Sequence, residues 1–251
     1  MNIIMSGCSG SFGKAVRERL QNKGHLVFGV GLGGPHYIVD FLSELAISED
    51  VVTDIFDEAE NFFDGNTTGL INNAGITRID FTSQHSLKDF IDVMHVNLTI
   101  PWLLSREFVR RTERDASTFG AENLGLRRII NTSSMAATSV LRASPGYCAS
   151  KAGLESITKV MAKELAGKLP ILVAAIAPGG VDNTDMVQQA IHDLVRTRGM
   201  SLEEANKYNR QSPFGRNMTH EEVVDVFDFA INKMPIYMSG TILKCTGGMG
   251  I

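Results

Sequence analysis

Two side chains that can move a proton, Tyr147 and Lys151, stand four residues apart, and Ser134 lies thirteen residues upstream. Residues i and i+4 project from one face of a helix, so a helix here would hold the ammonium beside the phenol. A nearby cation favours the phenolate and lowers a tyrosine pKa from its usual value of about 10. The spacing suggests a tyrosine acid/base, although Tyr-x-x-x-Lys also occurs by chance on solvated helix faces.

Short apolar runs alternate with helical segments along the chain. The predicted strands are 3–6, 26–30, 37–39, 69–72, 128–131, 171–177 and 241–245. The predicted helices are 12–23, 43–63, 86–95, 99–117, 145–168, 185–210 and 219–232, the last with Thr219 and Glu222 in a capping box. Only residues 31–36 separate the second strand from the third, too few for a crossover helix. This order predicts an α/β fold, a single-domain Rossmann-type doubly wound parallel sheet over residues 1–251 with helices on both faces.

The composition is that of a globular protein with a sizeable core. The chain has 251 residues, of which 43% are hydrophobic and 21% charged, and its net charge is −4. This charge gives no reason to expect nucleic-acid or membrane partners. Cys8, Cys148 and Cys245 are scattered and suggest no metal site. The first residues lack the basic and long apolar regions of a secretory signal, and we expect a cytoplasmic protein.

A glycine-rich loop follows the first strand and opens the first helix. Glycines there let the backbone turn sharply and approach a pyrophosphate closely, and the helix N-terminus supplies N–H donors. The residues expected to contact a dinucleotide are Gly7, Ser9, Gly10, Ser11, Phe12 and Gly13. The alternative is a strand-to-helix turn that binds nothing.

With these motifs in order, the chain resembles the short-chain dehydrogenase/reductase family over essentially its whole length. After the glycine loop come Asp40, Asn72-Asn73-Ala74-Gly75, Asn97, Ser134, Tyr147, Lys151, Pro178-Gly179, Thr184 and Gly247-Gly248. The resemblance implies an oxidoreductase that transfers a hydride between NAD(P)(H) and a small-molecule carbonyl or secondary alcohol.

The resemblance also implies a catalytic tetrad. Tyr147 would give or take the substrate proton, and Lys151 would lower the tyrosine pKa and bind the nicotinamide ribose. Ser134 would orient the substrate oxygen, and Asn97 would hold a water in the proton relay.

The implied cofactor is NADP or NAD. Beyond the glycine loop, the implied contacts are Asp40, Asn73, Ala74, Gly75, Tyr147, Lys151, Pro178, Gly179, Val181 and Thr184. At the end of the second strand, Gly31 stands at the position of the acidic residue that would exclude NADP. No Arg or Lys stands there either, and we expect a mild preference for NADP.

The sequence departs from the family pattern at two places. Ser11 stands where the commonest loop has glycine, and the Gly7, Gly10 and Gly13 spacing matches sugar-nucleotide-modifying members. An extra residue after Pro178 leaves open whether Asn183 or Thr184 meets the nicotinamide. The alternatives are therefore a sugar-nucleotide epimerase or lyase using the same tetrad, and a non-catalytic NAD(P)-binding regulator.

Residues 183–213 are expected to form a lid over the substrate. The stretch 72–78 is similar to 3-oxoacyl-carrier-protein reductases, but it borders the cofactor and does not identify the substrate. Family members mostly form tetramers through helices like 99–117 and 145–168, so we expect a homo-oligomer, a tetramer or a dimer.

Overall fold

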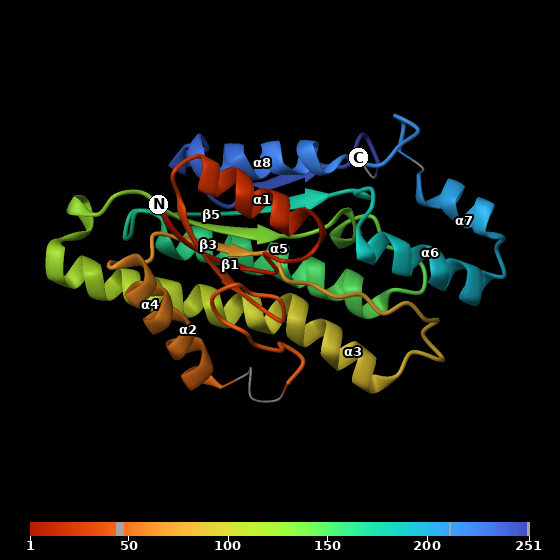
Figure 1. Ribbon diagram of the computed structural model, residues 1–251, viewed down its shortest axis with the longest axis horizontal. Coiled ribbons are helices and arrows are strands. Elements are labelled where there is room, and N and C mark those ends of the chain that lie inside the picture. Colours follow the sequence, from red (N-terminus) through yellow and green to blue (C-terminus); the bar gives the residue numbers. More distant parts are fainter. Residues whose placement is uncertain (44–47, 211, 250–251) are drawn as a thin grey trace.

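A single parallel sheet forms the centre of the molecule (Figure 1). The computed structural model describes residues 1–43, 48–210 and 212–249. The strands are β1 (Asn2–Ser6), β2 (Leu26–Val30), β3 (Gly69–Asn72), β4 (Arg127–Thr132), β5 (Ile171–Pro178) and β6 (Ile242–Cys245). Their order is β2-β1-β3-β4-β5-β6. The chain therefore leaves β1 toward one edge and β3 toward the other, which opens a crevice at their carboxyl ends.

Helices cover both faces of this sheet. They are α1 (Ser11–Asn22), α2 (Glu49–Phe63), α3 (Leu87–Met94), α4 (Ile100–Phe119), α5 (Pro145–Leu165), α6 (Asp185–Arg198), α7 (Leu202–Asn209) and α8 (His220–Asn232). Helices α1 and α8 lie on one face, and α2, α4 and α5 lie on the other (Figure 1). The predicted fold class is confirmed.

The central strands are apolar because both of their faces are buried. In β1, Ile3 and Met5 pack in the cluster that contains Phe227 of α8. Between them, Ile4 points to the opposite cluster, which contains Phe108 of α4. Strands buried in this way read as continuous apolar runs rather than as alternating ones.

The edge beyond β2 differs from the prediction. The expected strand 37–39 is reduced to one isolated parallel bridge between Val30 and Tyr37. The loop before it is too short to carry the chain back for a full parallel pairing. The expected helix 43–63 begins only at Glu49, with Ser48 as its N-cap; residues 44–47 lie outside the described part of the chain.

Two other predicted helical stretches are built differently. The segments 86–95 and 99–117 join through a π-helical turn, His95–Thr99. The segment 185–210 is divided into α6 and α7 because Gly199 ends α6 in a left-handed conformation. The capping box of Thr219 and Glu222 at α8 is confirmed. No helix in the described ranges is long and apolar enough to cross a bilayer.

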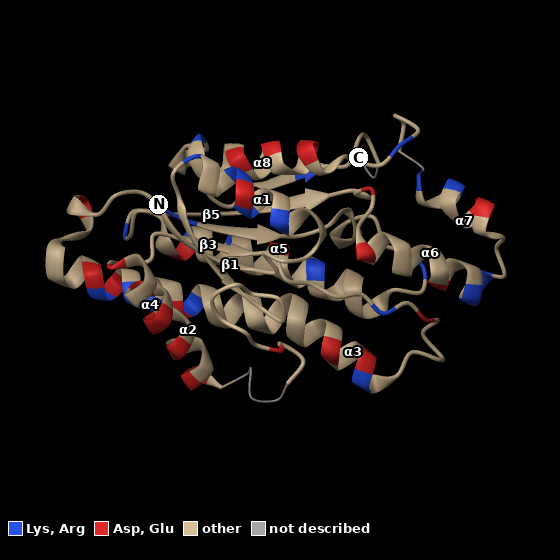
Figure 2. Cartoon of the chain, in the orientation of Figure 1, with Lys and Arg blue, Asp and Glu red and all other residues tan. Residues whose placement is uncertain are grey.

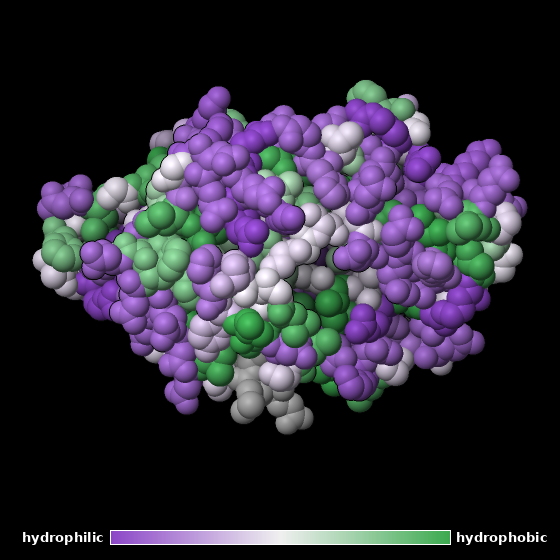
Figure 3. Space-filling view, in the orientation of Figure 1, coloured by the Kyte–Doolittle hydropathy of each residue, from purple (hydrophilic) through white to green (hydrophobic). Residues whose placement is uncertain are grey.

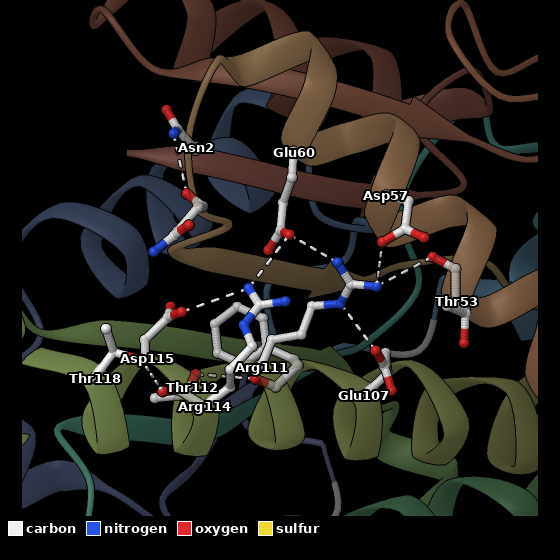
Figure 4. A network of polar contacts seen from close by, with 12 residues as sticks. Asn2, Thr53, Asp57, Glu60, Glu107, Arg111, Thr112, Arg114, Asp115 and Thr118 are labelled. Carbon is white, nitrogen blue, oxygen red and sulfur yellow. Dashed lines mark hydrogen bonds and ion pairs between the residues drawn. The ribbon is translucent and has the colours of Figure 1, made fainter.

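A buried ion network fastens α2 to α4 (Figure 4). Arg111 of α4 is 7% exposed. Its guanidinium lies 2.7 Å from Asp57 and from Glu60, both on α2, and 2.8 Å from Glu107 one turn away. Arg111, Glu60 and Glu107 are shielded from water, whereas Asp57 is exposed. Loss of Arg111 would therefore leave two shielded carboxylates without their main cation.

Candidate active site

A cavity of about 250 Å³ opens at the carboxyl ends of the strands. The face in Figure 3 is hollowed near the loop that joins β1 to α1, with pale and green residues in the hollow and mostly purple residues around it. The predicted residues that line the cavity are Gly7, Gly10, Ser11, Phe12, Gly13, Asn73, Ala74, Gly75, Ser134, Tyr147, Lys151, Pro178, Gly179, Val181 and Thr184.

The glycine loop has a shape that side chains would prevent. Gly7 has φ +63°, and a Cβ on Gly13 would lie 2.2 Å from the Gly7 carbonyl oxygen. Gly10 is the N-cap of α1 and makes no side-chain hydrogen bond to the first turn. Among the described residues, the amides of 11–13 have no acceptor. These N–H groups and the helix dipole fit the pyrophosphate of a dinucleotide.

Asn73 connects this loop to the centre of the sheet. Its Nδ2 donates to the Gly7 carbonyl oxygen at 3.0 Å, and its Oδ1 accepts from the Thr132 hydroxyl at 3.1 Å. The Ser6 hydroxyl accepts from the amides of Asn73 and Ala74 at 3.1 and 3.2 Å. The carboxyl ends of β1, β3 and β4 are thereby locked around the cavity.

Tyr147 and Lys151 lie on one face of α5 and are both buried. The Lys151 Nζ is 5.8 Å from the Tyr147 ring centroid. Burial raises the pKa of Tyr147, and a hydrogen bond with Ser134 opposes that change. The expected lowering of the tyrosine pKa by Lys151 is therefore not met in this structure, because burial disfavours the phenolate more than the surroundings stabilise it.

Lys151 itself is held by the backbone. Its Nζ donates to the Thr132 carbonyl oxygen at 2.7 Å. Burial lowers the pKa of Lys151 to about 8. Gly75 lies beside the ammonium, since a Cβ at that position would be in ordinary contact with Nζ at 3.5 Å. The site thus contains a cation that holds its proton less tightly than an exposed lysine does.

Asn97 lies behind the cavity and does not line it. The side chain is fully buried, with Oδ1 accepting from the Ile76 amide at 2.8 Å and Nδ2 donating to the Ile76 carbonyl oxygen at 2.9 Å. Nδ2 also faces the Ser150 hydroxyl at 3.2 Å. The π-helical turn places Asn97 here, and such turns are frequent at functional sites.

Two predicted cofactor contacts lie outside this cavity. The Ser9 hydroxyl donates to the Gly33 carbonyl oxygen, and Asp40 accepts from the Leu42 amide at 2.9 Å. Between the two candidates after Pro178, Thr184 lines the cavity and Asn183 does not. Thr184 also caps α6 by accepting from the Val187 amide.

The sequence interpretation missed five residues that line the cavity: Thr132, Ser133, Asp185, Met186 and Val187. Ser133 donates to the buried carboxylate of Glu155 at 2.9 Å, one helical turn beyond Lys151. The Ser11 hydroxyl accepts from the Asp185 amide at 3.2 Å, which joins the glycine loop to the start of α6. Thr132 and Ser133 could have been predicted to line the cavity, because they directly precede Ser134 in the sequence.

Comparisons with known sequences agree with this geometry. A family model described as short chain dehydrogenase matches residues 1–194. The 3-oxoacyl-acyl-carrier-protein reductase of Aquifex aeolicus is 34% identical over 247 residues, which cover 98% of this chain and 86% of the relative. The reductase of the same name from Vibrio cholerae is 30% identical, covering 98% and 96%.

Solved structures share the fold. A short chain dehydrogenase family protein of Francisella tularensis is 25% identical with a TM-score of 0.77, over 98% of this chain and 97% of that one. Ligand-free aldohexose dehydrogenase of Thermoplasma acidophilum has a TM-score of 0.81 at 22% identity, covering 98% and 93%. At 22% identity, the similarity to the Thermoplasma acidophilum enzyme concerns the fold alone.

Proposed function

Because this chain belongs to the short-chain dehydrogenase family and is an NAD(P)-dependent oxidoreductase, we propose that it interconverts a carbonyl and a secondary alcohol with Tyr147 as the acid/base. The observation that carries the proposal is the convergence of Tyr147, Ser134 and Lys151 on one cavity beside the glycine loop. The nicotinamide supplies or accepts the hydride when bound, so the protein contributes position and proton transfer.

Each member of the tetrad has a part in that proton transfer. Tyr147, whose pKa is raised by burial, holds its proton at neutral pH and donates it to a carbonyl oxygen that Ser134 orients. Lys151, with a pKa lowered to about 8, is able to pass a proton onward in the operating range. Asn97 fixes the Ile76 backbone through two hydrogen bonds. It thereby positions the segment that contains Gly75 in the cavity wall.

The dinucleotide would lie along the glycine loop, the segment 73–75 and the segment 178–184, with Thr184 at the nicotinamide end. A preference for NADP is supported at the end of β2. There, burial and then the charge of Arg17 lower the pKa of His36, so the imidazole is neutral at pH 7 and Arg17 is the charged group. A 2′-phosphate is attracted to a guanidinium. Equal or better kcat/KM with NADH than with NADPH would refute this preference.

The remaining features of the proposal concern the whole chain. Residues 1–251 would act as one dinucleotide-binding and catalytic domain, with 183–213 as the lid. The lid is supported by a small apolar cluster of Ile191, Leu194 and Ala205, which packs α6 against α7 separately from the main core. A cytoplasmic location and a homotetramer or dimer stay predictions.

The relatives named above are reductases and dehydrogenases, which does not favour an epimerase, a lyase or a regulator without turnover.

The decisive variant is Tyr147→Phe, which keeps the aromatic ring and removes the hydroxyl proton. We expect turnover of a carbonyl panel to fall at least about 1000-fold, within the range of general acid catalysis, while the Kd for NADPH changes less than about 2-fold. Tyr237→Phe, at a fully exposed ring, is the matched control. Retained activity in Tyr147→Phe would refute the assigned role.

A further inference from the structure

A second cavity, of about 310 Å³, is lined by residues that follow those of the first along the chain. Its walls are the next part of the same two segments. Residues 73–75 and 184–187 line the first cavity, and residues 77–80 together with Gln189, Asp193 and Arg196 line the second. A substrate whose carbonyl lies beside Tyr147 would therefore extend its remaining atoms along α6 into this space.

The charges in the second cavity pair with one another. Arg78 lies 3.4 Å from Asp89, and Arg196 lies 3.3 Å from Asp193 and 3.5 Å from Asp80. Residues of both signs stand on α6 and on the segment leading to α3 (Figure 2). With two arginines and three aspartates lining it, the cavity has a formal charge of −1 when His85 is neutral. It therefore has no excess positive charge for an anionic group.

The second cavity also has uncharged hydrogen-bonding groups. Thr77 is 9% exposed and lines this cavity. The Nε2 atom of His85 is buried without a partner in that same part of the chain. The side-chain amide of Gln189 contributes a donor and an acceptor on the opposite wall. Gln189 is exposed to water, whereas a buried polar group left unpaired is unfavourable by about 1–3 kcal/mol. An apolar occupant would therefore leave His85 as the unsatisfied group.

We propose that the second cavity is a substrate subsite for a neutral, hydroxyl-bearing tail, so that the enzyme acts on polyhydroxylated carbonyls and alcohols. This inference rests on the proposed function and specifies its substrate class. Hydroxyl groups both donate and accept, and they match the hydrogen-bonding groups of Thr77, His85 and Gln189 without disturbing the ion pairs. Sites that hydrogen-bond a substrate hydroxyl reject analogues that lack it far more strongly than apolar pockets reject added hydroxyls.

The test compares acyclic alcohols of matched length. Purified protein is assayed in the oxidative direction with NADP⁺ and NAD⁺ on C5 and C6 alditols, 2-hexanol, 5-hydroxyhexanoate and 6-amino-2-hexanol. We expect kcat/KM for the best alditol to exceed that for 2-hexanol at least about 100-fold. Thr77→Val and Gln189→Leu should each lower the alditol value about 10-fold and leave the Kd for NADPH unchanged. Gln188→Leu, next to Gln189 but outside the cavity, is the matched control and should change neither value.

The outcomes separate the two proposals. Preference for 2-hexanol, the anion or the amine would overturn the subsite and leave the redox function intact. Saturation-transfer NMR of the alditols on NADPH-bound protein supplies the second readout. Alditol binding that is lost in Gln189→Leu, with no turnover of any alcohol, would overturn the redox function and keep the subsite. Absence of both binding and turnover of alditols would overturn the subsite.

Discussion

Replacement of Lys151 by Met should stabilise the protein at neutral pH while removing a catalytic group. Lys151 is 3% exposed, and burial lowers its pKa from 10.5 to about 8. Each pKa unit corresponds to about 1.4 kcal/mol. The lysine therefore destabilises the fold by about 3 kcal/mol at pH 7, where the unfolded chain binds a proton that the folded protein holds weakly.

The sign of this effect follows from the two pKa values. Below a pH of about 8 the full penalty is present, because the lysine is charged in both states. Between about 8 and 10.5 the folded lysine is neutral while the unfolded one is still protonated, so the penalty falls as pH rises. At pH 10 about 1 kcal/mol remains. Between pH 7 and pH 10, the free energy of unfolding of the wild type should rise by about 2 kcal/mol relative to that of Lys151→Met.

The comparison of two pH values removes a second effect. The variant also loses the 2.7 Å hydrogen bond from Nζ to the Thr132 carbonyl oxygen, which contributes about 1 kcal/mol. That loss lowers the net gain at pH 7 to about 2 kcal/mol but leaves most of the pH dependence unchanged.

The assay is urea unfolding of cofactor-free protein at pH 7 and pH 10, at one protein concentration. The control is Lys159→Met, an exposed lysine on the same helix, which should stay within about 0.5 kcal/mol of wild type at both values. A Lys151→Met protein that is less stable than wild type at pH 7, or a difference that does not vary with pH, would refute the reasoning.

Three further variants test the loop, the π-helical turn and the ion network. In Gly13→Ala, the new Cβ would meet the Gly7 carbonyl oxygen at 2.2 Å, so calorimetry should show NADPH affinity reduced at least about 100-fold. Asn97→Ala leaves both Ile76 backbone groups unpaired; unfolding experiments should show a loss of about 2–4 kcal/mol, and activity should fall even below the melting temperature. Arg111→Met leaves the shielded carboxylates of Glu60 and Glu107 without their main cation. This change should lower stability by about 3 kcal/mol while kcat at low temperature changes less than about 2-fold; a large fall in kcat would contradict the separation of Arg111 from the site.

The local pattern of the chain was enough to predict the fold class and the glycine loop, whereas the rest of the predicted cavity lining came from the family resemblance. Apolar runs separated by helical segments require a parallel sheet covered on both faces, because each run has too few polar positions to face water. The glycine loop was readable for a similar reason, since Gly13 allows a backbone approach that other residues exclude. The strand 37–39 was wrong because edge pairing depends on the neighbouring loop rather than on the apolar run itself.

Tertiary structure decided the chemistry of the groups. The i, i+4 spacing indicated that Tyr147 and Lys151 share a helix face, but only packing determined that both would be buried, with the tyrosine pKa raised and the lysine pKa lowered. Contacts such as Ser11 with Asp185, 174 residues apart, leave no periodic trace in a sequence. Burial and long-range contacts depend on how the elements pack against one another, whereas sequence patterns report which residues lie close along the chain.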